Sequence, residues 1–65
     1  MTIKNKNQLN NFLKGWSIGY REFCTIDEIE YIVYFDSDCN IVFENNIGCE
    51  SFVFKSKRQA INYFF

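Results

Sequence analysis

Apolar residues near the N-terminus recur with the period of a helix. The residues that share one stripe are spaced three or four positions apart: Leu9, Phe12, Leu13 and Trp16. This stripe predicts a helix over 6–14, with Asn5 as its N-cap and Gln8 in a weaker form of the capping box. Trp16 is expected to plug the core, and a stacking platform for a ligand is the alternative.

A second helix is predicted at the other end of the chain. Ser56 and Gln59 have the spacing of a capping box, in which the hydroxyl binds the Gln N–H and the Gln side chain reaches back. The residues expected to face inward from this helix, which runs to the C-terminus, are Ala60, Ile61 and Phe64.

Between the helices the pattern changes to alternation, which is typical of strands. The segments expected to form strands are 20–26, 29–35, 41–43 and 51–55, and 20–26 is the least regular of them. Segment 29–35 is nearly apolar on both sides, as in a central strand. Turns are expected at Asp27–Glu28, over 36–40 and over 45–48, where Asp, Asn, Ser and Gly gather.

These elements predict one small α+β domain over 1–65. In it, an antiparallel sheet of three to four strands carries the N- and C-terminal helices on one face, in the order α-β-β-β-β-α. The short connections between elements fit an antiparallel meander.

The aromatic content is high for a chain of 65 residues, with eight Phe, four Tyr and one Trp. A domain this small has room for only about 15 fully buried side chains. The surplus favours a second apolar surface that a monomer would leave in water. A homodimer that buries the C-terminal aromatics is therefore one interpretation, with an interface formed by Tyr63, Phe64 and Phe65.

The chain offers little for catalysis. It contains no His, so a general base at neutral pH would need a strongly shifted carboxylate or thiol. Three Cys without a Cys-x-x-Cys pair predict reduced, mostly buried thiols and no zinc site. The spacing of Asp36, Asp38 and Asn40 matches the opening of a calcium loop, but Ile47 stands where the bidentate Glu is required. We therefore expect a non-enzymatic protein without a metal or cofactor.

Charge is segregated along the sequence. All eight acidic residues lie between Glu22 and Glu50, and all seven Lys and Arg lie outside that stretch. One explanation is structural, because oppositely charged layers attract each other and acids keep an aromatic sheet soluble.

The functional explanation is a negative surface for a basic protein, since complementary charge steers encounter and Tyr side chains anchor the complex. The residues predicted to form this surface are Glu22, Asp27, Glu28, Glu30, Tyr31, Tyr34, Asp36, Asp38 and Glu44.

An alternative site lies at the start of the C-terminal helix. A helix N-terminus with a hydroxyl and nearby cations suits an anion, and the residues concerned are Lys55, Ser56, Lys57 and Arg58. Pairing of these cations with acids of the sheet is the simpler interpretation. As a function, the segment indicates a small nucleic-acid-binding or regulatory protein, although acidic strands would repel phosphates.

In size, clustering of acids and lack of catalytic residues, the chain resembles small phage-encoded inhibitors of host nucleases and defence systems, including anti-CRISPR proteins. The resemblance is one of general type, and no motif carries it. Because the N-terminus lacks a signal-peptide core and no apolar run reaches the roughly 18 residues of a membrane span, we expect a protein of the bacterial cytoplasm without a membrane partner.

Overall fold

The computed structural model describes residues 1–16, 19–48 and 50–65. Its elements are β1 (Thr2–Ile3), α1 (Lys6–Phe12), β2 (Arg21–Ile26), β3 (Ile29–Phe35), β4 (Ile41–Asn45), β5 (Ser51–Phe54) and α2 (Lys57–Phe64). The α+β class is therefore confirmed, with a helix near each end of the chain.

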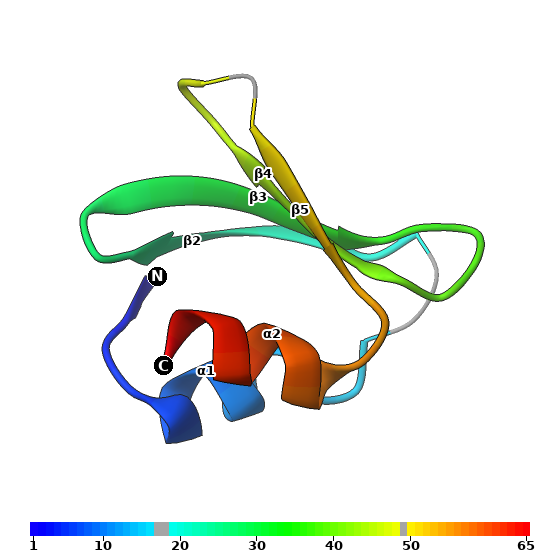
Figure 1. The fold of residues 1–65 in the computed structure, drawn as a ribbon, viewed down its shortest axis with the longest axis horizontal. Coiled ribbons are helices and arrows are strands. Elements are labelled where there is room, and N and C mark those ends of the chain that lie inside the picture. The colour runs from blue at the N-terminus through cyan, green and yellow to red at the C-terminus, as the bar shows by residue number, and fades with distance from the viewer. Residues whose placement is uncertain (17–18, 49) are drawn as a thin grey trace.

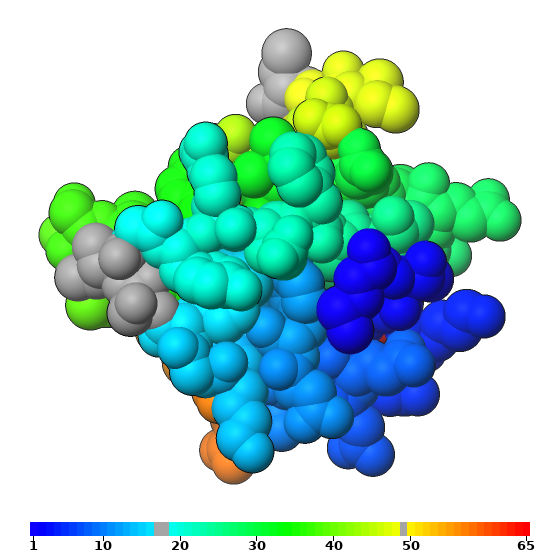
Figure 2. All heavy atoms as spheres, turned by 180° about the vertical axis from the view of Figure 1, so that it is seen from behind, coloured from blue at the N-terminus to red at the C-terminus, as the bar shows by residue number. Residues whose placement is uncertain are grey.

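The sheet is larger than expected and is mixed. It has five strands in the order β1-β2-β3-β4-β5, because the segment before α1 forms a parallel edge strand beside β2. The N–H of Thr25 donates to the carbonyl of Met1 at 2.7 Å, and Ile3 is buried. A strand of two residues is too short to show alternation, so the sequence pattern missed it. Figure 2 shows the N-terminal segment, in dark blue, lying against β2.

Both helices lie on the same side of the sheet, and the opposite side carries no element (Figure 1). The core fills the space between the two layers. Its most deeply buried large side chains come from both layers and from β1: Phe43, Ile3, Leu9, Leu13, Ile41, Val33 and Cys24. Trp16 is half-buried and packs against this core through Phe12 and Phe35, as expected of a plug.

The two helices begin with the same hydrogen-bond pattern. Gln8 N–H donates to Asn5 Oδ1 at 2.9 Å, and Gln59 N–H donates to Ser56 Oγ at 3.2 Å. Each Gln side chain then accepts from the residue before the cap, Lys4 or Lys55, instead of from the cap residue itself. Both predicted caps are confirmed, and each satisfies backbone donors that a helix start leaves without partners.

The hairpin turns follow the local chemistry of their residues. Asp27 and Glu28 connect β2 to β3 with φ values of 54° and 66°, the left-handed backbone of a tight hairpin turn. The loop between β3 and β4 is organised by Asp36, whose Oδ1 accepts from the N–H groups of Asp38 and Asn40, both at 2.9 Å. The carboxylate of Asp36 thus closes a hairpin, as the hairpin interpretation of this segment requires.

The cysteines differ from one another. Cys24 is buried in the core, and burial raises the pKa of its thiol to about 12. Cys39 is exposed, because it occupies a left-handed position at the tip of the β3–β4 loop, so the expectation of burial is wrong for this residue. Cys49 lies outside the described residues.

The aromatic core is centred on Phe43. Its ring lies 4.8 Å from Phe64 of α2 and 5.8 Å from Tyr31 of β3, measured between centroids. Phe64 therefore packs on the sheet of its own chain and is half-buried there. The helical spacing of Ala60 and Phe64 brings both to the inner face of α2.

We predict that core packing is measurable with a matched pair of substitutions. Ile41→Val removes one methylene from a side chain that is 2% exposed, and it should lower the free energy of unfolding by about 0.5–1.5 kcal/mol. Ile47→Val makes the same chemical change at a side chain that is 93% exposed, and it should change that free energy by less than about 0.5 kcal/mol. Urea denaturation measures both, and equal losses would contradict the packing described.

Candidate functional site

The side of the sheet away from the helices is an exposed surface, which we call the open face. Strand register assigns alternate residues to it, through pairs such as Phe23 with Ile32, Tyr34 with Val42, and Val42 with Val53. Its members from β2 to β5 are Arg21, Phe23, Thr25, Glu30, Ile32, Tyr34, Val42, Glu44, Ser51 and Val53.

Apolar side chains cross the open face as a stripe. Phe23 is 49% exposed on β2 and Val53 is 58% exposed on β5. Between them, Ile32 is half-buried and Val42 is buried, although no helix covers it. The stripe therefore holds apolar side chains partly in water on the face where no other element of the chain packs.

Tyr34 and Glu44 form the central polar contact of the open face. The Tyr34 hydroxyl donates to Glu44 Oε1 at 2.7 Å, and the Arg21 guanidinium lies 5.6 Å from the centre of the Tyr34 ring. The hydrogen bond to Glu44 raises the pKa of Tyr34, assisted by burial and opposed by the positive charge of Arg21. Tyr34 is thus held in its neutral form by an acid beside it.

The structure divides the acidic residues between the two ends of the strands. One group, which we call the acidic end, lies at the β2–β3 and β4–β5 turns and on the adjoining open face: Asp27, Glu28, Glu30, Glu44 and Glu50. Asp36 and Asp38 lie at the other end of β3. That strand has seven residues, so the two groups are separated by about 20 Å.

The predicted surface is therefore brought together only in part. Asp27, Glu28, Glu30 and Glu44 share one end of the molecule, while Asp36 and Asp38 do not join them. Tyr31 is 5% exposed and packs beneath α2, so it is a core residue and not a surface anchor. Glu22 faces the helix side of β2, where it lines a hollow with Trp16 and Tyr20.

The surface also includes residues that the sequence argument left out. Phe23, Ile32 and Val53 supply the apolar stripe, and Glu50 joins the acidic end. The signal for Phe23 was present, since alternation in 20–26 places it on the face opposite Cys24. Ile32 and Val53 could not be told from core residues without knowing which side the helices cover.

Among the residues that the structure describes, the acids of the sheet have no hydrogen bond to a Lys or Arg side chain. Across the described ranges, the partners of Glu22, Glu30, Asp36 and Glu44 are backbone N–H groups, the side-chain amides of Asn40 and Asn46, and the Tyr34 hydroxyl. These carboxylates are therefore hydrogen-bonded to neutral groups and not to Lys or Arg side chains.

The basic segment lies at the opposite end of β5 from Glu50. Lys55, Lys57 and Arg58 are exposed there. The Ser56 hydroxyl accepts from Gln59 N–H, and Lys55 N–H donates to Gln59 Oε1. The capping bonds thus occupy Ser56 Oγ as an acceptor and the Lys55 N–H as a donor, while the cations themselves remain in solvent.

The C-terminal aromatics are distributed differently from the expectation of one interface. Tyr63 is 58% exposed and lies over Phe52 and Phe54, with ring centroids at 5.1 and 5.4 Å. Phe65 is 39% exposed at the end of α2. Tyr63 is therefore an exposed ring beside β5, whereas Phe64, which also packs on Phe54, is half-buried.

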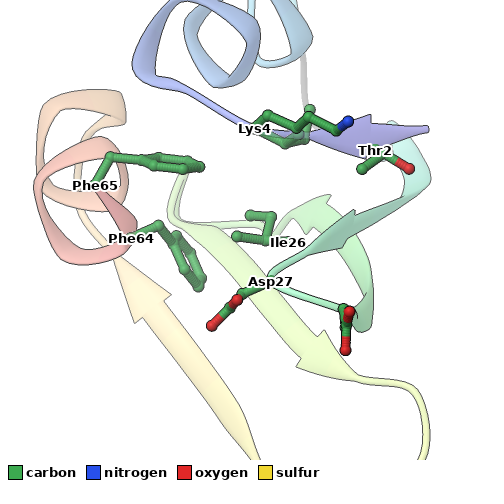
Figure 3. A pocket seen from close by; sticks show the side chains of 8 residues that line it. Thr2, Lys4, Ile26, Asp27, Phe64 and Phe65 are labelled. Carbon is green, nitrogen blue, oxygen red and sulfur yellow. The ribbon is translucent and has the colours of Figure 1, made fainter.

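A hollow of about 470 Å³ lies where β1, the β2–β3 turn and the end of α2 meet (Figure 3). Phe64, Phe65 and Ile26 give it apolar walls, and Lys4 lies on one side with Asp27 on another. In the part of the chain that the structure describes, no group of His, Cys, Asp or Glu is arranged to hold a metal ion. No described helix is long and apolar enough to cross a membrane.

Comparison with protein families, with curated proteins and with solved structures finds no match to this chain. The arguments for its function therefore come from its own residues.

We predict that the Tyr34–Glu44 contact appears in the titration of the tyrosine. Glu44→Gln removes the negative charge and should lower the pKa of Tyr34, followed by the NMR shift of its ring with pH. Glu30→Gln changes a neighbouring acid that does not bind Tyr34 and should have a smaller effect. An unchanged pKa in Glu44→Gln would contradict the contact.

The same contact gives stability a pH dependence of known sign. Because the pKa of Tyr34 is higher in the folded chain, its contribution is complete below the ordinary Tyr pKa of about 10 and is lost as pH rises through the folded value.

Proposed function

We propose that this chain is a non-enzymatic protein-binding module that presents its open face and acidic end to a basic protein. The observation that carries the proposal is the combination of exposed apolar side chains and unneutralised acids on one uncovered surface. Phe23 and Val53 offer area that gains free energy when removed from water, and the acids offer steering.

The distribution of charge supports a protein partner over nucleic acid. Glu30 and Glu44 lie on the open face itself, and carboxylates there repel the phosphates that dominate nucleic-acid affinity. A partner with Lys or Arg around an apolar centre has the complementary chemistry.

We further propose that the module acts as an inhibitor from a phage or another mobile element, in the cytoplasm of a bacterial host. A protein that handles nucleic acid has a basic surface, and an acidic module that covers this surface would exclude the nucleic acid. The small size of the chain and its resemblance in type to phage inhibitors support this role.

The alternative is a nucleic-acid-binding or regulatory protein that uses the start of α2. The observation in its favour is that Lys55, Lys57 and Arg58 are exposed, and no hydrogen bond joins them to an acid among the described residues. A salt-sensitive interaction with DNA would identify this function.

We predict that a defined basic probe distinguishes these functions. The isotope-labelled chain is titrated with a peptide of Lys, Arg and Leu, and separately with duplex DNA, while backbone amide shifts are followed by NMR. The peptide should perturb β2–β4 residues of the open face and the acidic end, and its binding should weaken as salt is added. DNA should cause no shifts at low salt.

Two loop acids provide a matched control. Glu28→Lys and Asp38→Lys make the same change of charge at exposed turn residues, one at the acidic end and one at the opposite end. Glu28→Lys should slow peptide association roughly ten-fold at low salt, and Asp38→Lys should slow it less. Equal effects of the two variants, or DNA-induced shifts confined to residues 55–58, would refute the proposed surface.

A further inference from the structure

Strand β5 is an edge of the sheet that has the features of a pairing surface. It lies last in the strand order, and its four residues contain no Pro and no charge. Edge strands of soluble proteins are usually protected by such residues, by bulges or by a covering element. β5 is short, which gives some protection, but among the described residues no other strand pairs with its outer side.

Register determines which backbone groups of β5 point outward. Asn45 N–H donates to the Glu50 carbonyl at 2.9 Å, so these two residues form a hydrogen-bonded pair of the β4–β5 ladder. Pairs of this kind alternate along antiparallel strands, so Phe52 and Phe54 also direct their N–H and C=O groups toward β4. The groups of Ser51, Val53 and Lys55 therefore point away from the sheet.

Lys55 is a partial exception among these outward residues. Its N–H already donates to Gln59 Oε1, which leaves its carbonyl as the free group. A strand that pairs with β5 can therefore bind both the N–H and the C=O of Ser51 and of Val53. At Lys55 it can bind only the C=O.

We propose that β5 pairs antiparallel with β5 of a second copy of this chain, about a two-fold axis at Val53. In this register the Val53 residues exchange both of their backbone hydrogen bonds. Each Ser51 N–H then donates to the free Lys55 carbonyl of the other copy. The two-fold register therefore makes four backbone hydrogen bonds, and the Ser51 carbonyl, which faces the occupied Lys55 N–H, stays without a backbone partner.

Side chains are complementary in the same register. On the open face, Val53 meets Val53 of the second copy, and with Val42 on each side they form a continuous aliphatic row. This row covers two side chains that are each 58% exposed in the single chain. On the helix side, Phe52 comes opposite Phe54 of the second copy, and the exposed Tyr63 ring lies over both of these strand positions.

Charge fixes the choice of partner. Glu44 pairs with Ser51 across β4 and β5, and the proposed register places Lys55 of the second copy on the other side of Ser51. Glu44 and that lysine are then two strand spacings apart, about 10 Å between backbones, with only the small serine side chain between them. Glu44 Oε1 already accepts from the Tyr34 hydroxyl on the β3 side, so the lysine has to reach across Ser51 to the other carboxylate oxygen. The symmetry repeats the contact.

The proposed dimer goes beyond the binding function and is independent of it. A two-fold axis perpendicular to the sheet keeps both pairs of helices on one side, so the two open faces become a single larger surface. A monomeric chain would still present one open face to a basic protein.

The first test measures self-association of the purified full chain by sedimentation equilibrium over a range of concentrations. Val53→Pro removes the N–H at the centre of the pairing but leaves the β4–β5 ladder intact, because that N–H points outward. It should weaken dimerisation at least ten-fold. Val53→Thr keeps the N–H and the branched shape and should retain the dimer.

The second test uses the charges. Lys55→Glu places acids together and Glu44→Lys places bases together, so each variant alone should dimerise less than the parent chain. An equimolar mixture of the two should form a heterodimer at close to the parent affinity, since both contacts are then attractive, one in the parent arrangement and the other with its charges exchanged. Amide hydrogen exchange should show concentration-dependent protection at Ser51 and Val53.

Two results would overturn the proposal. The chain could stay monomeric up to about 1 mM, where even a weak interface would be half-associated, or Val53→Pro could leave the dimer unchanged. Failure of the mixed variants to associate would exclude this register. Protection of Ser51 and Val53 that appears only when an extended peptide is added would assign the edge to a foreign strand instead.

Discussion

The packing of Phe43 beneath α2 is the contact on which the rest of the structure depends. Its side chain is fully buried and touches aromatic rings from β3, β5 and α2. A chain this short buries a smaller fraction of its surface than a large domain does, so it has little stability to spare. Concentrating large rings in one layer between helix and sheet lets a small domain gain the most free energy from few residues. The same arrangement keeps both helices on one side and leaves the other side uncovered.

The sequence predicts this fold well where its local signals are strong. The caps at Asn5 and Ser56, the central strand 29–35 and the turn at Asp27–Glu28 are observed as expected, because each depends on neighbouring residues. β1 could not be predicted, because two residues carry no period and their pairing with β2 is a long-range contact. Tyr31 was misplaced for a related reason. An aromatic residue in a strand that is apolar on both sides gives no indication of which side the helices cover.

The position of the acidic residues in space could not be predicted from the sequence for a similar reason. The acids lie in one stretch of the sequence. In the structure, however, the seven-residue strand β3 separates the acids at one of its ends from those at the other. Most of the acids that share one stretch of the sequence are in space divided between the acidic end and the β3–β4 loop, which carries Asp36 and Asp38. Glu30 and Glu44 remain together because they occupy diagonal positions on adjacent strands. A surface that attracts a basic protein therefore depends on strand register as much as on composition.

The two faces of the sheet impose separate demands on the same strands. Along β3, Val33 and Tyr31 must fit the interior, while Ile32 and Tyr34 have no such neighbours to satisfy. Substitutions at the exposed positions of the open face, such as Phe23 and Val53, can accordingly change that surface with little effect on the interior. Under the proposed function, a gene encoding such a chain can follow a changing target through mutations on one side of its strands, while the side beneath the helices drifts slowly.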